Sequence, residues 1–257
     1  MNIDKNFINN LKDFSKTLSK EIVKIQNSSF SASDKKDGTP LTEADLLSNE
    51  EINLFLKKHS SCLNIISEEN KQIEYEERKD WEYYWVIDPL DGTKEFIKGN
   101  EDYCVNIALC RHENPIFGCV IQPTTQDFYF TFDGGSYKNF NLINCSEPRR
   151  ADKLLKVVAS SSHINEDTQN FIDSLKEYGE VELVNIGSAL KFCKIATGEA
   201  HIYPRVGPTM EWDTCAPHAL INFSGGFVFK YKEIQELVYN KKDLLNPNFV
   251  AASFTSF

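Results

Sequence analysis

The sequence predicts a layered α/β fold of the α+β type, divided into two lobes. A helical pattern of apolar residues opens the chain at 3–25, strand-like segments follow one another over 83–132, and strands alternate with helices in the second half. Such alternation is typical of sheets covered by helices. A polar stretch at 133–152 separates these regions, so we place an N-terminal α+β lobe at residues 1–140 and a C-terminal α/β lobe at residues 141–257.

The N-terminal lobe begins with an amphipathic helix at 3–25, followed by the polar stretch SASDKKDGTP, which predicts a turn. Thr42 begins a second helix that runs to about Leu56, since the tetrapeptide TEAD has the spacing of a capping box. LNIIS at 63–67 predicts a short buried strand. The highly charged stretch 71–82 predicts a solvated loop.

From Tyr83 onward the pattern becomes that of a β-sheet. The segments YYWVI, YCVNIALCR, PIFGCVIQP and DFYFTF follow one another at hairpin-like intervals. In the second half the strand-like segments KVVASSS, VELVNIGS and AHIYPR alternate with helical patterns at 165–178, 188–197 and 213–223.

The charge balance excludes several classes of partner. The chain has 257 residues, 41% of them hydrophobic, and a formal net charge of -10. An acidic protein has no electrostatic footprint for a nucleic acid polymer or for anionic lipid. If the substrate is a polyanion, something other than net charge must hold it, and a bound cation is the obvious candidate. We expect the partner to be a small molecule.

The cysteine and histidine patterns argue against zinc and disulfides. Seven cysteines occur without a CxxC pair, and the five histidines lack ligand-type spacing. Small thiols in a reducing compartment explain this pattern best. No apolar stretch has the form of a signal peptide or the length of a transmembrane segment, so we expect a cytoplasmic protein. The expected oligomeric state, a monomer or a homodimer, is left open by the sequence.

Acidic side chains lie where predicted strands end. Glu68 follows one strand, Asp88 and Asp91 follow the next, and Asp213 stands between a loop and a helix. Acids at the ends of buried strands are unfavourable unless they are paired or bind a metal. Carboxylates, with the carbonyl of Leu90 between two of them, are hard oxygen ligands that suit Mg²⁺.

Each of these features alone has a plainer interpretation. Asp-Pro and Asp-Gly are ordinary turn sequences, and Glu68-Glu69 fits a solvated pair. Asp213 fits a helix N-cap, and Thr42 with Asp45 fits a capping box. The motifs gain weight only in combination.

In combination they resemble the inositol-monophosphatase superfamily. WVIDPLDGTKEFIKGN contains the D-P-[ILV]-D-G-T core of that superfamily. Its T-x-x-D motif matches at Thr42, its Glu-Glu pair at Glu68, and its later W-D motif at Trp212, all in the family's order. The resemblance extends from about residue 5 to residue 250. It implies a layered αβαβα sandwich of the inositol-monophosphatase and sugar-phosphatase type.

Two longer strings are similar to the nucleotidase branch of the superfamily. They are DPLDGTKEFIKGN and GSALKFCKIATGEAHIYPRVGPTMEWDT. The similarity implies a phosphatase that removes the 3'-phosphate of adenosine 3',5'-bisphosphate, or of its sulfated form, in sulfur assimilation and nucleotide recycling. The alternatives are an inositol-1-phosphate or fructose-1,6-bisphosphate phosphatase of the same fold, or a non-catalytic nucleotide sensor.

The resemblance also implies roles for single residues. Glu68, Asp88 and the Leu90 carbonyl would hold one Mg²⁺, and Asp88, Asp91 and Asp213 a second, with a third ion left open. Lithium inhibits members of this superfamily at a metal position, and we expect the same here. The implied catalytic residues are Glu68, Thr93, Asp45 and Asp213.

The resemblance implies that residues of both lobes would hold the substrate. Lys191 and Arg205 supply cations for a second phosphate. The plainer alternatives are that Lys191 caps a helix and that Arg205 pairs with Glu211. The family usually has glycine where this chain has Pro217, which puts a backbone contact to ligand there in doubt. The full implied substrate-binding set is Glu68, Leu90, Asp91, Gly92, Thr93, Ser188, Lys191, Arg205 and Asp213.

The resemblance also implies an alternative cellular location for this protein. Related bacterial proteins associate with the cytoplasmic face of the inner membrane. The resemblance therefore adds a peripheral position on that face to the expected cytoplasmic one, although the sequence itself contains no basic amphipathic helix that would bind there.

Overall fold

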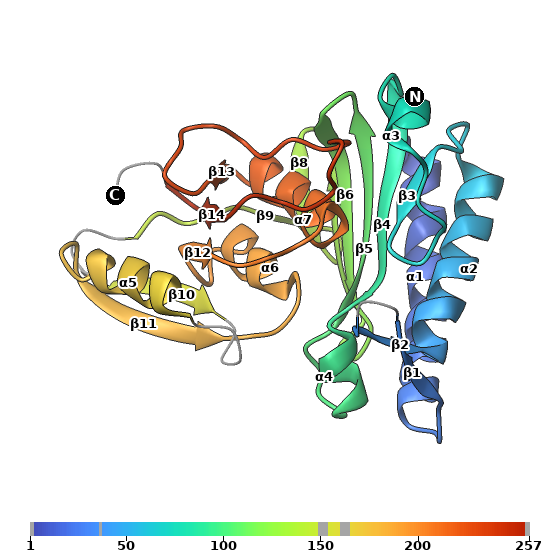
Figure 1. Cartoon of the computed structure of the whole chain (residues 1–257), viewed down its shortest axis with the longest axis horizontal. Coiled ribbons are helices and arrows are strands. Elements are labelled where there is room, and N and C mark those ends of the chain that lie inside the picture. Colours follow the sequence, from blue (N-terminus) through green and yellow to red (C-terminus); the bar gives the residue numbers. More distant parts are fainter. Residues whose placement is uncertain (1–2, 36–37, 149–153, 160–164, 255–257) are drawn as a thin grey trace.

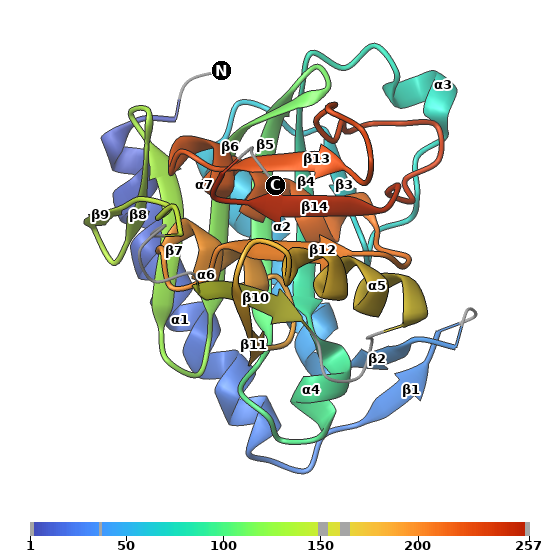
Figure 2. The same ribbon diagram turned by 90° about the vertical axis from the view of Figure 1, so that its left-hand side faces the viewer.

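The computed structural model describes residues 3–35, 38–148, 154–159 and 165–254. These residues form a seven-stranded sheet, a five-stranded sheet and a two-stranded ribbon. Helices cover the outer face of each large sheet and fill the space between them (Figures 1 and 2). Three hydrophobic cores hold the five layers together. One lies on the outer side of the first sheet, one fills the space between the two sheets around α6 and α7, and one lies under the outer helix of the second sheet. The predicted αβαβα sandwich is confirmed.

The first sheet follows chain order. Its first two strands are parallel and all others are antiparallel. The carboxyl ends of the parallel pair therefore meet at one edge of the sheet. The strands are β3 Ile65–Ser67, β4 Tyr83–Asp91, β5 Cys104–Arg111, β6 Asn114–Gln122, β7 Asp127–Phe132, β8 Gly135–Lys138 and β9 Asn141–Ile143.

Two long helices cover the outer face of this sheet, α1 Lys5–Gln26 and α2 Glu43–His59. The apolar side of α1 is buried as its spacing predicts, and Phe7 stacks on Trp85 of β4 with ring centroids 5.7 Å apart. Thr42 caps α2 in the predicted capping box, which fixes the end of the helix that faces the site.

The second sheet has the order β11-β10-β12-β14-β13. Its helix α5 covers the outer face, whereas α6 and α7 lie between the two sheets (Figure 1). The elements are β10 Leu154–Ala159, α5 Glu166–Leu175, β11 Glu180–Asn185, α6 Leu190–Ala196, β12 Ile202–Arg205, α7 Glu211–Phe223, β13 Phe227–Lys230 and β14 Phe249–Ala252.

The N-terminal half contains two short elements that were not predicted. The polar stretch predicted as a turn joins β1 Ala32–Asp34 and β2 Pro40–Thr42 into a hairpin, and residues 36–37 lie outside the described residues. The charged stretch predicted as a solvated loop contains α3 Tyr75–Arg78. Arg78 is only 3% exposed, because its guanidinium donates to the side chain of Asn240 and to the carbonyl of Lys242.

The lobe division at residue 140 stays a prediction. Strand β9, Asn141–Ile143, still pairs with β8. The pairing would move the end of the N-terminal lobe to Ile143. Helix α7, from the second half of the chain, packs across β6 of the first sheet, so the two halves share a core.

That crossing point depends on Gly118. A Cβ atom there would lie 2.1 Å from the carbonyl oxygen of Ala216 in α7. Gly118→Ala is therefore expected to push α7 away and lower the free energy of unfolding by about 1–3 kcal/mol. Gly207→Ala, whose Cβ would meet nothing within 4 Å, is the control. Equal melting temperatures of the two variants in thermal denaturation would contradict this account of the packing.

Candidate active site

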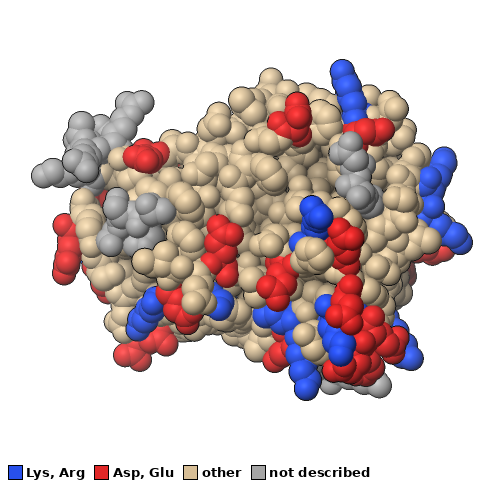
Figure 3. Space-filling model, turned by 90° about the horizontal axis from the view of Figure 1, so that it is seen from above, with Lys and Arg blue, Asp and Glu red and all other residues tan. Residues whose placement is uncertain are grey.

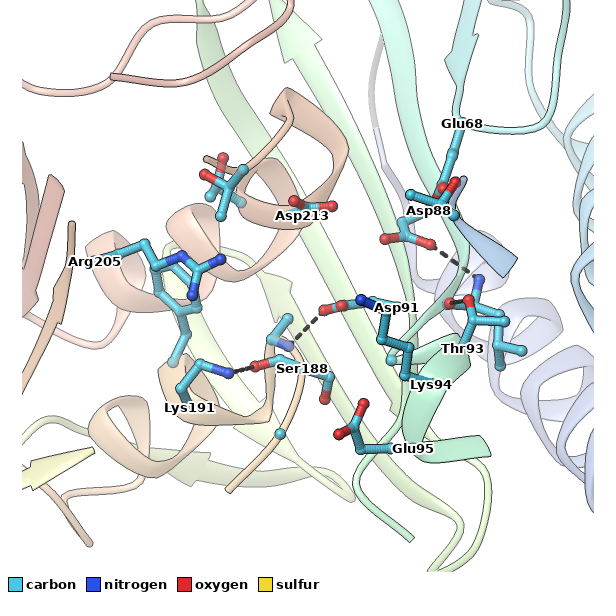
Figure 4. Close-up of a pocket in the computed structure, with 18 of the residues that line it drawn as sticks. Glu68, Asp88, Asp91, Thr93, Lys94, Glu95, Ser188, Lys191, Arg205 and Asp213 are labelled. Atoms are coloured by element: carbon cyan, nitrogen blue, oxygen red, sulfur yellow. Dashed lines mark hydrogen bonds between the residues drawn. The ribbon is translucent and has the colours of Figure 1, made fainter. Parts of the chain in front are cut away.

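A cavity of about 300 Å³ opens between the two sheets, at the carboxyl ends of β3 and β4. Figure 4 shows acidic side chains around its right and centre, with Lys191 and Arg205 on the left. The structure thus brings together residues that are far apart in sequence. The predicted residues that line the cavity are Glu68, Asp88, Leu90, Asp91, Gly92, Thr93, Ser188, Lys191, Arg205 and Asp213.

The parallel pairing of β3 and β4 places three of the acids. Glu68 directly follows β3, and its backbone N–H donates to the carbonyl of Ile87 in β4 over 3.2 Å. The pairing of β4 with β5 becomes irregular between Asp88 and Asp91, where the strand bends. The N–H of Leu90 donates to Oδ1 of Asp88 over 3.0 Å and fixes that carboxylate in the bend.

Asp213 reaches the cavity from the start of α7. It occupies the third position of the helix, and its Oδ2 accepts from the N–H of Met210 over 2.8 Å. It is therefore part of the helix cap without being the N-cap residue. The same carboxylate lies within electrostatic range of Asp91 and Glu68, so a capping role does not separate it from the acid group.

Burial and the charges of neighbouring acids raise the pKa values of buried carboxyl groups in the cavity. Burial, followed by the charges of Glu68, Asp91 and Asp213, raises the pKa of Asp88 well above its ordinary range. Burial and the charge of Asp91 raise the pKa of Asp213 to about 8. Buried like charges of this kind are stabilised by a cation. The oxygen-only donor set is the type that Mg²⁺ binds.

The type of donor atoms in the cavity fits a magnesium ion, but the side chains are not yet arranged around one common position. Within 3–35, 38–148, 154–159 and 165–254, no three acidic, histidine or cysteine side chains stand ready as a ligand group. Lys35 gives one reason, because its ammonium donates to Glu68 over 2.6 Å and also to Glu69. Burial lowers the pKa of Lys35, but the two carboxylates outweigh this effect and raise it.

Sequence reasoning missed Lys35. It lies in the hairpin between β1 and β2, which was predicted only as a polar turn. The two adjacent lysines of SASDKKDGTP were the available signal.

Thr93 stands beside the acids and joins them to α2. Its hydroxyl lies 3.1 Å from Oδ1 of Asp45 and 3.1 Å from the carbonyl of Leu90. Asp45 also accepts from the N–H of Thr42 over 2.7 Å. Burial raises the pKa of Asp45, and its hydrogen bonds to Thr42 and Thr93 oppose the rise. Asp45 therefore closes the capping box and contacts Thr93 at the same time.

The opposite wall of the cavity is cationic. Lys191 is 5% exposed, and its Nζ donates to the carbonyl of Ser188 over 2.7 Å. Burial lowers the pKa of Lys191 to about 8, against the favourable charge of Asp91. Arg205 donates to the carbonyl of Pro208 over 2.9 Å, while its buried Nε has no hydrogen-bond partner among the described residues.

The alternative pairing of Arg205 with Glu211 is not what the structure has. Glu211 is fully buried and accepts from the ammonium of Lys241 over 2.6 Å. It also accepts from the backbone N–H of Asn240 over 2.7 Å. Arg205 is thus left available to the cavity. Pro217 lies inside α7 without ending the helix.

Other lining residues were not singled out from the sequence. Lys94 and Glu95 lie at the lower edge of the cavity in Figure 4. Tyr203 places its ring 5.3 Å from the Lys191 ammonium. The strings TKEF and YPR contain these residues, but neither pattern alone indicates which side chains face a ligand.

The raised pKa of Asp213 predicts a pH dependence for the metal-free protein. The folded state keeps protons that the unfolded state releases above the ordinary value of 3.8, so stability falls as pH rises toward 8. His218, whose pKa burial lowers to about 3, has the opposite effect only below its ordinary value of 6.5. In EDTA, the melting temperature is therefore expected to fall between roughly pH 6.8 and pH 8. The lower limit lies above the ordinary pKa of His218, and the upper limit is the raised pKa of Asp213.

The Asp213→Asn variant provides the control for this measurement. An amide cannot titrate, so its melting temperature should change less over the same pH interval. A melting temperature of the unmodified protein that rises or stays constant across the interval would contradict the assigned environment of Asp213.

Three further features concern the cysteines, the helices and the surface charge. All seven cysteines are free thiols. None of the helices built from the described residues has the length and apolar character needed to cross a bilayer. On the face seen in Figure 3, acidic side chains lie among the basic ones instead of leaving one basic surface.

Comparisons with known proteins extend the resemblance over the whole chain. The model of the inositol monophosphatase family matches residues 5–256. The 3'(2'),5'-bisphosphate nucleotidase CysQ of Salmonella typhimurium is 37% identical over 216 residues, which cover 84% of this chain and 86% of that protein. The CysQ protein of Escherichia coli is 38% identical with the same coverage.

Solved structures agree with this assignment. The crystal structure of CysQ from Bacteroides thetaiotaomicron has a TM-score of 0.84 and 35% identity, and the match covers 96% of this chain and 98% of that one. An IMPase/NADP phosphatase complexed with Mg²⁺ and phosphate shares the fold at 16% identity and a TM-score of 0.76, over 97% of this chain and 91% of that one. The chain belongs to the inositol monophosphatase family.

Proposed function

We propose that this protein is a magnesium-dependent 3'(2'),5'-bisphosphate nucleotidase that converts adenosine 3',5'-bisphosphate, or its sulfated form, to AMP and phosphate. The curated CysQ relatives, at 37% and 38% identity, support the activity. The observation that carries the proposal is the polarity of the cavity. One wall holds a group of buried carboxylates and the opposite wall holds two cations, Lys191 and Arg205.

The acidic wall would hold the metal ions. Glu68, Asp88 and the Leu90 carbonyl form one ligand set, and Asp88, Asp91 and Asp213 form another. Two Mg²⁺ ions bound there would neutralise the scissile phosphate and make a water molecule a better nucleophile. Burial, together with mutual repulsion, raises the pKa values of Asp88 and Asp213, and this supports such a use of the site.

Thr93 and Asp45 would orient the attacking water. The Thr93 hydroxyl donates its proton to Oδ1 of Asp45, so its own oxygen remains free to accept a hydrogen bond from water. Glu68 borders the same part of the cavity and supplies a second acceptor. These contacts would hold the water in line with the phosphate and take up its proton.

The cationic wall would distinguish a bisphosphate from a monophosphate. Lys191 is held toward the cavity by the Ser188 carbonyl, and Arg205 has an unpaired buried donor. An ammonium and a guanidinium together match a second phosphate on the nucleotide. Inositol 1-phosphate has no group for these cations, which favours the nucleotide over that alternative.

A substrate panel tests the proposal. Phosphate release is measured with Mg²⁺, and with EDTA as control, from adenosine 3',5'-bisphosphate, inositol 1-phosphate and fructose 1,6-bisphosphate. The expected result is the highest kcat/KM for the adenosine compound and none in EDTA. Preference for either of the other two compounds would contradict the assigned substrate. Tight binding of the nucleotide without phosphate release would favour a sensor.

Further properties are proposed from family membership. They are inhibition by lithium, a third metal position, and a monomeric or homodimeric state. The free thiols support a reducing compartment such as the cytoplasm. A peripheral position on the inner membrane stays a prediction.

A further inference from the structure

We propose that Asp102 is a positioning residue that holds the segment 187–191 in place and so sets the position of Lys191. This inference rests on the proposed function, because it concerns selection of the proposed bisphosphate substrate. Asp102 itself does not line the cavity. It follows from the packing of Asp102 between two loops of the site, which carry the metal-binding and the phosphate-binding residues respectively.

Asp102 touches both loops through glycines. A Cβ atom at Gly187 would lie 2.8 Å from the Asp102 Cβ and 2.8 Å from its carbonyl oxygen. A Cβ atom at Gly92, the N-cap of α4 (Thr93–Ile97), would lie 2.9 Å from the same carbonyl oxygen. Both positions therefore require glycine for close approach to Asp102, and Gly92 also has a φ of +99°.

The side chain of Asp102 makes one directed contact. Its Oδ2 accepts a hydrogen bond from the backbone N–H of Gly187 over 3.0 Å, across a sequence separation of 85 residues. A charged acceptor makes a stronger bond to a backbone N–H than a neutral one does. This bond fixes the backbone at Gly187, where the chain has left β11 and begins to line the cavity.

Three consecutive features depend on that point. Ser188 has a φ of +49°, a conformation that a residue other than glycine adopts only when its surroundings hold it there. The N–H of Ala189 then donates to Oδ2 of Asp91 over 2.5 Å. The carbonyl of Ser188 accepts from Nζ of Lys191 over 2.7 Å. Movement of Gly187 would therefore displace the acceptor that orients the Lys191 ammonium.

The negative charge of Asp102 would not help to bind a phosphate, so its contribution must come from its hydrogen bond. A carboxylate near a phosphate-binding segment repels the phosphate, and Glu95 already lies nearby, with its Cγ 3.4 Å from the Cβ position of Gly187. The hydrogen bond that Asp102 accepts from the Gly187 N–H compensates for this repulsion. An asparagine in the same position would retain an acceptor oxygen and lose the charge.

The experiment compares three variants with the unmodified protein. Asp102→Ala removes the acceptor, Asp102→Asn retains one, and Glu101→Ala removes the adjacent exposed carboxylate as a control. Kinetics are measured with adenosine 3',5'-bisphosphate and with 3'-AMP, which lacks the second phosphate. Hydrogen exchange across 187–191 and thermal melting are measured on the same samples.

For Asp102→Ala we expect a KM for the bisphosphate that is about tenfold higher, as for loss of one charged hydrogen bond. The fall in kcat should be smaller and equal for both substrates, because the Ala189 contact to Asp91 loosens as well. The KM for 3'-AMP should hardly change, and the amides of 187–191 should exchange faster. Asp102→Asn and Glu101→Ala should resemble the unmodified protein. In a Lys191→Ala background, Asp102→Ala should have no further effect on KM.

Three results would overturn the inference. The first is an unchanged exchange rate across 187–191 in a folded Asp102→Ala protein. The second is an equal rise in KM for both substrates, and the third is additive effects with Lys191→Ala. If the unmodified protein hydrolyses neither nucleotide, the proposed function fails, while the exchange data still decide whether Asp102 holds the segment.

Discussion

Asp88→Asn is expected to lower kcat for adenosine 3',5'-bisphosphate by at least about a thousandfold, because it removes a ligand charge from both proposed metal positions. In EDTA the same variant should melt at a higher temperature than the unmodified protein. An amide replaces a carboxyl group whose ionisation is opposed by burial and by the charges of Glu68, Asp91 and Asp213. Loss of activity with gain of stability is the combination that a metal ligand predicts.

A surface acid provides the control for this variant. Asp173 lies exposed on α5 and pairs with Lys176, so Asp173→Asn should change neither the rate nor the metal-free stability noticeably. The measurements are phosphate release at saturating Mg²⁺ and thermal melting in EDTA. Near-normal, magnesium-dependent turnover by Asp88→Asn would exclude Asp88 as a shared ligand.

Lys191→Ala is expected to raise the KM for adenosine 3',5'-bisphosphate roughly tenfold to a hundredfold, the range for loss of a charged hydrogen bond. The KM for 3'-AMP should rise far less, since 3'-AMP has no second phosphate for the ammonium. The physical reason is the burial of Lys191, which is 5% exposed and whose pKa is lowered by burial. Because water does not solvate the buried ammonium well, a bound anion stabilises its charge.

Lys194, one turn further along α6, is the matched control. It is half-buried and pairs with Glu199, so Lys194→Ala removes an equal charge without reaching the cavity. Steady-state kinetics with both nucleotides distinguish the two positions. Equal losses on the bisphosphate and on 3'-AMP would assign Lys191 a structural role only.

Much of the fold follows from local patterns in the sequence. Periodicity predicts α1 and the antiparallel run from β4 to β7, because their apolar residues repeat at the spacing of a helix face and of strands. The acids at strand ends are predicted from the same patterns, and family motifs link them into one site. The structure places these residues around one cavity.

What the sequence does not reveal depends on contacts between distant segments. Strands β13 and β14 are short, and β14 becomes a sheet member only by pairing with β12 and β13. Lys35 lies in a polar hairpin, and only the folded chain brings it to Glu68. Asp102 belongs to no motif, and its partner Gly187 is 85 residues away. No local pattern encodes such pairings.

The location of bound metal tests the central claim most directly. Crystals soaked in Mn²⁺, a stand-in for Mg²⁺, should give anomalous peaks between the carboxylates of Glu68, Asp88, Asp91 and Asp213, with Glu68 turned away from Lys35. Peaks elsewhere, or carboxylates that face separate surroundings without a shared ion, would contradict a two-metal phosphatase site.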